Sequence, residues 1–209
     1  SRSRAFDAGG YYVMRDGWTR AANYLLLDCG PHGTLNCGHA HADALSFEVA
    51  AHGQTLLVDP GTYTYTGSAQ ARDYFRSSAA HNTLVLDGES SSVPAGPFSW
   101  SHVARAKARR WVSAEQFDFF DGEHDGYTRL HHPAVHARSV LFIKNRYWIV
   151  RDRVESAGEH SCSLYFHFAP GTESLMDNDG VVVRAAHQPA LHMFAFGAGG
   201  QWHEEEGWV

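Results

Sequence analysis

Several features that define common classes of protein are scarce in this sequence. Three cysteines among 209 residues cannot form the disulfide framework of a small stapled domain. No run of about 18 apolar residues occurs, so the sequence predicts no transmembrane helix. Positive charge is not in excess either, because the formal net charge is −6 with histidine neutral. This balance argues against a basic nucleic-acid-binding protein, and we expect neither nucleic acid nor a membrane span.

Histidine, by contrast, is abundant, with 15 residues in the chain. Imidazole is the commonest metal ligand in proteins and the usual general base near neutral pH. A single histidine is more often a surface or hydrogen-bonded residue than a functional one. The useful question is therefore which histidines the fold brings together.

Both ends of the chain break off in sequence that is typical of the interior of a domain. The last residues, Gly207-Trp208-Val209, resemble the middle of a strand, and the start before Tyr11 is equally abrupt. We therefore expect a fragment of a longer protein. Residues 1–4 are polar and do not contain the apolar core of a signal peptide.

The pattern of apolar residues predicts strands along most of the chain. Residues 161–168 alternate, with Cys162, Leu164, Phe166 and Phe168 on one face, which is the period of a β-strand. Two hairpins are predicted, one joined by residues 144–146 and one by His52-Gly53. Turn signals recur at short intervals, and the best helical segment is short, around residues 69–75. We predict an all-β fold, an antiparallel β-sandwich of many short strands with at most a short helix, forming one domain over residues 1–209.

The densest chemistry lies between residues 37 and 82. If residues 39–43 are extended, His39, His41 and Asp43 project to one face. Two histidines and an acid from separated segments can form a three-ligand zinc site with an open fourth position. An ideal hairpin through His52-Gly53 would pair Asp59 with Ser46, roughly 16 Å from His41 at 3.3 Å per residue. The segment of residues 39–43 must therefore fold back, or Asp43 is the ligand instead of Asp59.

Three blocks of sequence together resemble the heparinase II/III-like polysaccharide lyases. Their order and spacing are more specific than any one block, and the resemblance is firm over about residues 5 to 100. The blocks are Gly38-His39-Ala40-His41-Ala42-Asp43-Ala44-Leu45-Ser46-Phe47, then Leu56-Leu57-Val58-Asp59-Pro60-Gly61-Thr62-Tyr63, and then Arg72-Asp73-Tyr74-Phe75-Arg76-Ser77-Ser78-Ala79-Ala80-His81-Asn82-Thr83.

The resemblance implies an architecture and a metal site. Members of that family join an N-terminal α/α toroid to a C-terminal all-β sandwich, and this chain resembles the β domain alone. The implied cofactor is Zn²⁺, with ligands on His41, Asp59 and His81. The missing toroid, a partner in cis, would supply the main catalytic tyrosine, so we do not expect the isolated fragment to be active.

The resemblance also implies a reaction, the cleavage of a uronic-acid-containing polysaccharide by β-elimination. Such a reaction neutralises the C5 carboxylate, removes the C5 proton and protonates the leaving O4. His39 is our candidate base, and the candidates to assist it are Tyr63, Tyr65 and Tyr74. Arg72 and Arg76 are the candidates to bind the acidic polysaccharide, because guanidinium pairs with carboxylate or sulfate.

Two other functions remain open from the sequence. One is a non-catalytic carbohydrate-binding or structural sandwich module. The other is a cupin-like metal enzyme, which also carries His-x-His on a β-sandwich. A cupin places a Glu four or five residues after the second histidine, whereas Leu45 and Ser46 stand there and Glu48 comes too late. For the lyase we expect a periplasmic or secreted location in a bacterium.

Overall fold

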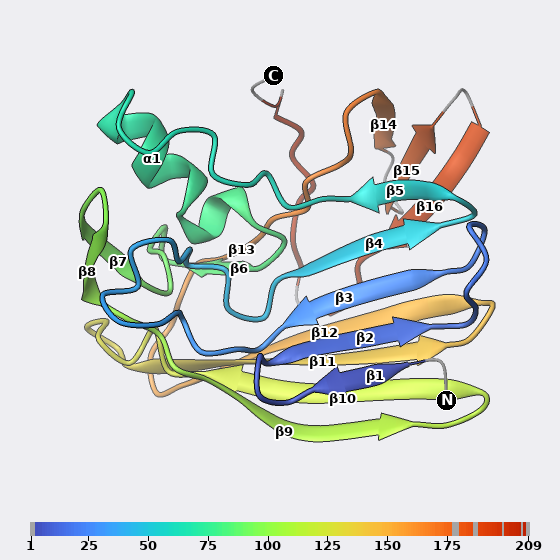
Figure 1. Cartoon of the computed structure of the whole chain (residues 1–209), viewed down its shortest axis with the longest axis horizontal. Coiled ribbons are helices and arrows are strands. Elements are labelled where there is room, and N and C mark those ends of the chain that lie inside the picture. Colours follow the sequence, from blue (N-terminus) through green and yellow to red (C-terminus); the bar gives the residue numbers. More distant parts are fainter. Residues whose placement is uncertain (1–2, 177–179, 186–187, 198, 206, 208–209) are drawn as a thin grey trace.

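The structure is a computed structural model that describes residues 3–176, 180–185, 188–197, 199–205 and 207. Two antiparallel sheets lie one against the other (Figure 1). The five-stranded sheet has the order β1–β2–β3–β4–β5, with strands Arg4–Phe6, Tyr11–Arg15, Tyr24–Asp28, Phe47–Ala51 and Gln54–Leu57. The four-stranded sheet has the order β12–β11–β10–β9, with strands β9 Ala106–Ser113, β10 Phe117–His124, β11 Ala134–Ile143 and β12 Tyr147–Ser156. The predicted all-β sandwich is confirmed.

The core lies between these two sheets. In β3 and β4 every second side chain is buried, and the same alternation runs through β10. Leu25 and Leu27 from the first sheet join Phe120, Val140 and Phe142 from the second in one cluster, and all five are fully buried. Burying one such side chain stabilises the fold by roughly 1.5–3 kcal/mol. Apolar alternation in the sequence therefore fixes which face of each strand points inward.

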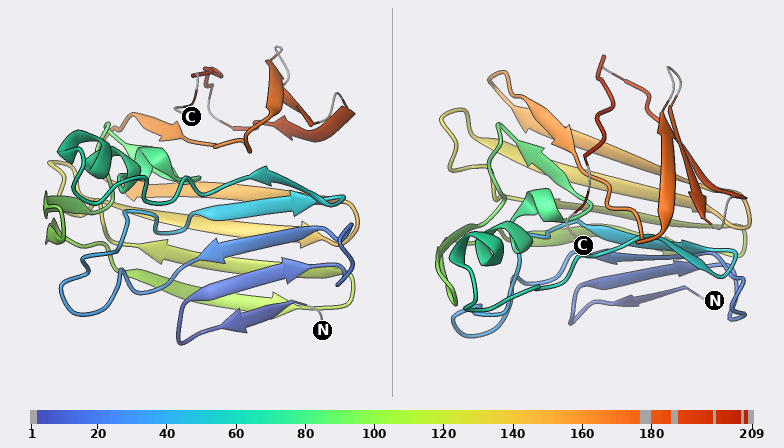
Figure 2. Two further views of the ribbon diagram at one scale, coloured as in Figure 1. Left: turned by 45° about the horizontal axis from the view of Figure 1, so that its top comes forward. Right: turned by 90° about the horizontal axis from the view of Figure 1, so that it is seen from above.

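Smaller elements surround the sandwich. The short helix α1 (Ala69–Phe75), capped by Ser68, and the 3-10 helix η1 (Ser78–Ala80) lie at the end of the sandwich where the hairpin of β7 (Val93–Gly96) and β8 (Ser99–His102) also lies (Figure 1). β6 (Leu84–Leu86) pairs with β13 (Cys162–Leu164). β14 (Thr172–Met176), β15 (Gly180–Ala185) and β16 (Gln188–Phe194) form a three-stranded sheet beside β5, as both views of Figure 2 show. The predicted helix at residues 69–75 is confirmed.

Both predicted hairpins are present, with one change of register. β11 and β12 pair directly from Ala134–Ser156 to Ile143–Tyr147. In the β4–β5 hairpin a bulge between Val49 and Ala50 pairs Val49 with Leu57. This shifts the pairing by one residue from the ideal hairpin that the sequence predicted.

The alternating segment of residues 161–168 forms a shorter strand than its pattern predicts. β13 ends at Leu164, and the side chains of Cys162 and Leu164 are exposed. The chain then crosses from β6 to β5, where His167 accepts a hydrogen bond from the amide of Val58 at 3.0 Å. Phe166 and Phe168 pack against the main core after this crossing. The predicted apolar face therefore packs against the core only in its second half, at Phe166 and Phe168.

None of the three cysteines forms a disulfide, and Cys29 alone is buried. Among the described residues no helix is long and apolar enough to cross a membrane.

Candidate metal centre and catalytic face

The loop that joins β3 to β4 carries two of the motif histidines, and it is folded rather than extended. Leu35, Cys37 and Leu45 adopt left-handed backbone angles, with φ of 54°, 55° and 62°. The amide of Ala42 donates to the carbonyl of Arg76 at 2.8 Å. Of the alternatives that the sequence left open, the fold-back is therefore the one found, and these turns bury the side chain of His41 and leave His39 exposed.

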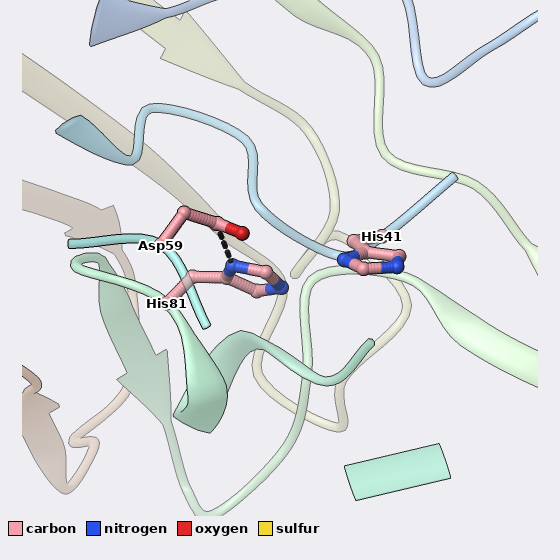
Figure 3. A group of neighbouring side chains, drawn as sticks. All are labelled: His41, Asp59 and His81. Carbon is pink, nitrogen blue, oxygen red and sulfur yellow. Dashed lines mark hydrogen bonds and ion pairs between the residues drawn. The ribbon is translucent and has the colours of Figure 1, made fainter. Parts of the chain in front are cut away.

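Three separate segments bring His41, Asp59 and His81 together. His41 lies in the folded loop, Asp59 follows β5, and His81 follows η1. One candidate ligand atom from each residue lies within 4.8 Å of the others. Nδ1 of His81 lies 2.6 Å from Oδ2 of Asp59, and the rings of His41 and His81 are 5.2 Å apart between centroids (Figure 3). The fold-back of the loop therefore supplies the proximity that an extended segment could not.

The protonation of this group suits a cation. Burial opposes the charge on Asp59, but the hydrogen bond and the charge of His81 lower the pKa of that carboxyl below its usual range. Burial also opposes the charge on His81, but its bond to Asp59 and the nearby carboxylates raise its pKa. Burial lowers the pKa of His41 to about 4, so this imidazole is neutral near pH 7. The site thus offers one neutral imidazole, one carboxylate and one imidazole that a cation would deprotonate.

A second feature points to the same cation. Nε2 of His81 is buried and has no hydrogen-bond partner among the described residues. In Figure 3 this nitrogen faces the side on which His41 lies. An unpaired buried nitrogen is costly unless a ligand satisfies it. Two imidazoles and a carboxylate are the donor set of three-ligand zinc sites, so the residues present fit Zn²⁺.

Asp43, the alternative ligand, lies outside this three-residue group. It borders a cavity of about 300 Å³ that is lined by further acids, Asp28, Glu48 and Asp59 among them. Burial and then the charge of Asp43 raise the pKa of Asp28 to about 7. The geometry favours Asp59 as the ligand, with the acidic cavity beside it adding negative potential.

His39 stands among aromatic rings instead of among the candidate ligands. Its ring meets that of Tyr65 edge-on at 5.4 Å between centroids and lies 6.1 Å from that of Phe98. Tyr63 and Tyr74 belong to a neighbouring group, in which both rings contact Phe75. All three predicted tyrosines are at least two-fifths exposed. Tyr65 therefore lies beside His39. Tyr63 and Tyr74 pack against Phe75 in the neighbouring group.

Arg72 and Arg76 are buried, with 1% and 0% of their surfaces exposed. Nη2 of Arg72 donates to the carbonyl of Gly38 at 3.1 Å, and its Nη1 lies 3.5 Å from Nε2 of His41. Arg76 donates to Asp73 and to the carbonyls of Gly96 and Pro97. This burial does not support the prediction of direct substrate contact. The guanidinium of Arg72 joins the histidine loop to the β7–β8 hairpin, and that of Arg76 joins the end of α1 to the same hairpin.

The β7–β8 hairpin is a part of the site that the sequence pattern did not reveal. Trp100 donates through Nε1 to the carbonyl of Cys37 at 2.8 Å, and the guanidinium of Arg76 lies 4.9 Å from the Trp100 ring. Phe98 stacks on Tyr65 at 5.9 Å. The available signal was the pair of aromatic residues that follows Gly96-Pro97, a turn-forming dipeptide.

A β-sandwich with a His–Asp–His group at one end defines the class to which the chain belongs. The model of the family described as "Heparinase II/III-like, C-terminal" matches residues 1–209. The chain therefore belongs to that family, as its sequence motifs indicated, and a cupin-like enzyme is not supported.

The curated relatives are longer proteins. A heparin-sulfate lyase of Pedobacter heparinus is 28% identical over 169 residues, which are 79% of this chain and 23% of the relative. A heparin-sulfate lyase of Bacteroides thetaiotaomicron is 27% identical over 186 residues, which are 84% of this chain and 24% of the relative. The chain thus spans about a quarter of the length of these relatives.

Solved structures show the same fold. Heparan sulfate lyase HepC from Pedobacter heparinus superposes with a TM-score of 0.71 at 21% identity, covering 92% of this chain and 32% of that one. A structure of heparinase III gives a TM-score of 0.72 at 23% identity, covering 88% of this chain and 28% of that one.

Proposed function

We propose that this chain is the metal-bearing β domain of a polysaccharide lyase that cleaves a uronic-acid-containing polysaccharide by β-elimination. The observation that carries the proposal is the convergence of His41, Asp59 and His81 at the end of the sandwich where the exposed His39 also lies. The heparin-sulfate lyase activity of the relatives points to an acidic, heparin-like glycosaminoglycan as the substrate. Because the chain spans about a quarter of those relatives, an N-terminal toroid in cis would form the other wall of the cleft.

In this proposal Zn²⁺ is held by His41, Asp59 and His81, and when bound it supplies positive charge that fixes the histidine loop. His39 is then presented to the substrate with its ring braced by Tyr65 and Phe98. Its position outside the ligand group leaves its imidazole available for proton transfer.

The residues can divide the elimination between them. An imidazole nitrogen of His39 takes the C5 proton, and the electron pair of that C–H bond forms the C4=C5 double bond. The C4–O4 bond breaks, and the leaving oxygen receives a proton from a phenol. The toroid would supply the main catalytic tyrosine, and Tyr65 is the best placed of the three tyrosines of this chain to assist it, because its ring contacts His39 directly.

Ultraviolet absorbance of the unsaturated uronate product tests the proposal in the full-length protein. His39→Ala should abolish activity while one zinc remains bound. His52→Asn is the matched control, because His52 lies in the exposed β4–β5 turn with a left-handed φ of 52° that Asn tolerates. Full activity in His39→Ala would remove His39 from the mechanism and would favour a non-catalytic sandwich module.

We also propose a periplasmic or secreted location, since a polymeric acidic substrate is met outside the cytoplasm. Cell fractionation of the native host with an antibody to this domain tests it. Recovery of the protein in the cytoplasm would contradict it.

A further inference from the structure

A row of buried polar side chains crosses the core-facing side of the four-stranded sheet. It consists of His124 on β10, His136 and Arg138 on β11, and Asp152 on β12. His124 and His136 are direct cross-strand partners, and so are Arg138 and Asp152. His124 is 1% exposed, and His136 and Arg138 are fully buried. None of the four belongs to the proposed metal centre, so their burial needs a separate explanation.

Successive hydrogen bonds connect these buried side chains, and each donor points toward Asp152. The amide of Gly126 donates to Nδ1 of His124 at 3.1 Å, so that nitrogen carries no proton. Nε2 of His124 then donates to Nδ1 of His136 at 3.0 Å, and Nε2 of His136 donates to Oδ1 of Asp152 at 2.6 Å. Both histidines are therefore neutral, in agreement with burial lowering the pKa of each. The tautomers are assigned from this pattern of donors and acceptors.

Asp152 in turn fixes a guanidinium. Burial opposes its charge, but the charge of Arg138 and the bond from His136 hold the pKa of Asp152 well below its usual range. Arg138 donates to it through Nε at 2.8 Å and Nη2 at 3.1 Å. This two-point contact leaves Nη1 of Arg138 pointing across the core with a single orientation.

Nη1 of Arg138 reaches both histidine-bearing segments of the metal centre. It donates to the carbonyl of Leu45 and to that of Asn82, each at 2.7 Å. Leu45 ends the folded loop that carries His41, and Asn82 is the residue after His81. The side chain of Asn82 also donates to the carbonyl of Val58, the residue before Asp59, at 3.0 Å. One guanidinium is thus linked to all three segments that converge on the site.

We propose that Arg138 is a positioning residue, which clamps the His41 loop to the Asp59–His81 pair, with Asp152, His136 and His124 holding it in register. The proposal rests on the proposed function, since it concerns the same His–Asp–His group. Arginine suits this place because its planar fork binds a carboxylate and two carbonyls at once, whereas lysine presents a single ammonium. Partners of this kind around metal ligands affect metal affinity by about 10–100-fold.

Two variants separate the clamp from simple stabilisation. Arg138→Lys keeps a cation to pair with Asp152 but cannot span both carbonyls. Asp152→Asn removes the charge of the ion pair but leaves Arg138 able to donate to Leu45 and Asn82. Co²⁺ titration of the purified protein, read by visible absorbance, should show about tenfold weaker binding and an altered spectrum for Arg138→Lys. Asp152→Asn should lose less, about threefold, because Arg138 keeps both carbonyl acceptors while one of the groups that orient it is weakened. Equal losses in both variants, in proportion to stability, would overturn the proposal.

Hydrogen exchange in the metal-free protein tests the role of Arg138 separately from metal binding. Hydrogen exchange of the amides of Ala42 and Leu45, which donate to Arg76 and Asp28, should accelerate in Arg138→Lys more than the amides of β11 do. Uniform acceleration would overturn the clamp. If wild type fails to bind Co²⁺, the proposed metal centre fails while this comparison still decides on Arg138. If Arg138→Lys does not fold, the double variant Arg138→Met with Asp152→Asn replaces it, because removing both charges of the buried ion pair leaves no unpaired charge. Unchanged exchange and affinity in that variant would count against the clamp.

Discussion

Nδ1 of His81 lies 2.6 Å from Oδ2 of Asp59, although 22 residues separate them in sequence. This contact joins the end of β5 to the segment after η1 and aims the opposite nitrogen of His81 at the side where His41 lies (Figure 3). A histidine held in this way has its tautomer set by the carboxylate. The pair is the fixed half of the proposed metal centre, and the folded loop brings His41, the other half.

Metal binding should stabilise the protein. The three ligand segments come from different parts of the chain, so a bound cation links them only in the folded state. Chelation followed by dialysis should lower the thermal midpoint, and one equivalent of Zn²⁺ should restore it. Calorimetry at pH 7 in buffers of different ionisation enthalpy should show proton release on binding, because His81 has a raised pKa and must lose its proton. An unchanged midpoint after chelation would contradict a metal that is part of the fold.

Stability of the metal-free protein should fall as the pH drops from 7 to 5. His124 and His136 have pKa values below the ordinary value of histidine, about 6.5, because burial disfavours their charged forms. The unfolded chain takes up protons at these positions below about pH 6.5, whereas the native state does not. Each histidine contributes a slope of at most about 1.4 kcal/mol per pH unit.

Other histidines modify this slope. Burial lowers the pKa of His32 to about 4, which adds to the acid sensitivity, while the raised pKa of His81 acts in the opposite direction. Urea unfolding of His124→Gln beside wild type isolates the contribution of the buried His124–His136 pair. The free energy of unfolding of the variant should depend less steeply on pH. Identical pH dependence in the variant and in wild type would contradict the neutral state of the two buried histidines.

Arg72→Met should destabilise the protein by about 1–3 kcal/mol, because it leaves the carbonyl of the buried Gly38 without its guanidinium donor. Nε of Arg72 donates to Pro97 and its Nη2 to Gly38. Arg105→Met is the control, since Arg105 is exposed, and it should stay within about 0.5 kcal/mol of wild type. Chemical denaturation measures both. Equal effects would mean that the buried guanidinium does not hold the loop.

Tyr65→Phe should lower the kcat of the full-length protein by up to about 100-fold, since general acid catalysis commonly contributes at least that much and Tyr65 assists this step. The ring remains, so the contacts with His39 and Phe98 persist and KM should change little. Tyr147→Phe is the matched control, because Tyr147 lies exposed on β12 away from the site. If Tyr63→Phe or Tyr74→Phe lowers kcat while Tyr65→Phe does not, the phenol has been assigned to the wrong group.

Much of the fold could be predicted from the sequence, because alternation of apolar residues records which face of a strand is buried. The hairpin around residues 144–146 and the helix at 69–75 followed from local signals. The path of residues 35–46 did not, because three left-handed residues other than glycine, Leu35, Cys37 and Leu45, set it, and tertiary contacts such as that of Ala42 with Arg76 hold the loop there. No local pattern announces such turns.

The residues of the candidate site could be predicted from the sequence, but the burial of the arginines around it could not. His41, Asp59 and His81 lie together as the motif implied. Sequence spacing could not show that Arg72 and Arg76 are buried, since arginine next to a functional motif is normally read as a surface cation. Arg138 was missed for a related reason. It is one charged residue in an alternating strand, and only the packing of both sheets reveals its bonds to Leu45 and Asn82.

The metal content of the full-length protein decides whether His41, Asp59 and His81 bind zinc. Wild type, His39→Ala and His81→Ala are purified in parallel, and zinc per chain is measured by mass spectrometry with near-ultraviolet circular dichroism as the check on folding. We expect close to one zinc per chain in wild type and in His39→Ala, and a loss of that zinc in folded His81→Ala. One zinc retained in His81→Ala, or none in wild type after supplementation, would contradict it.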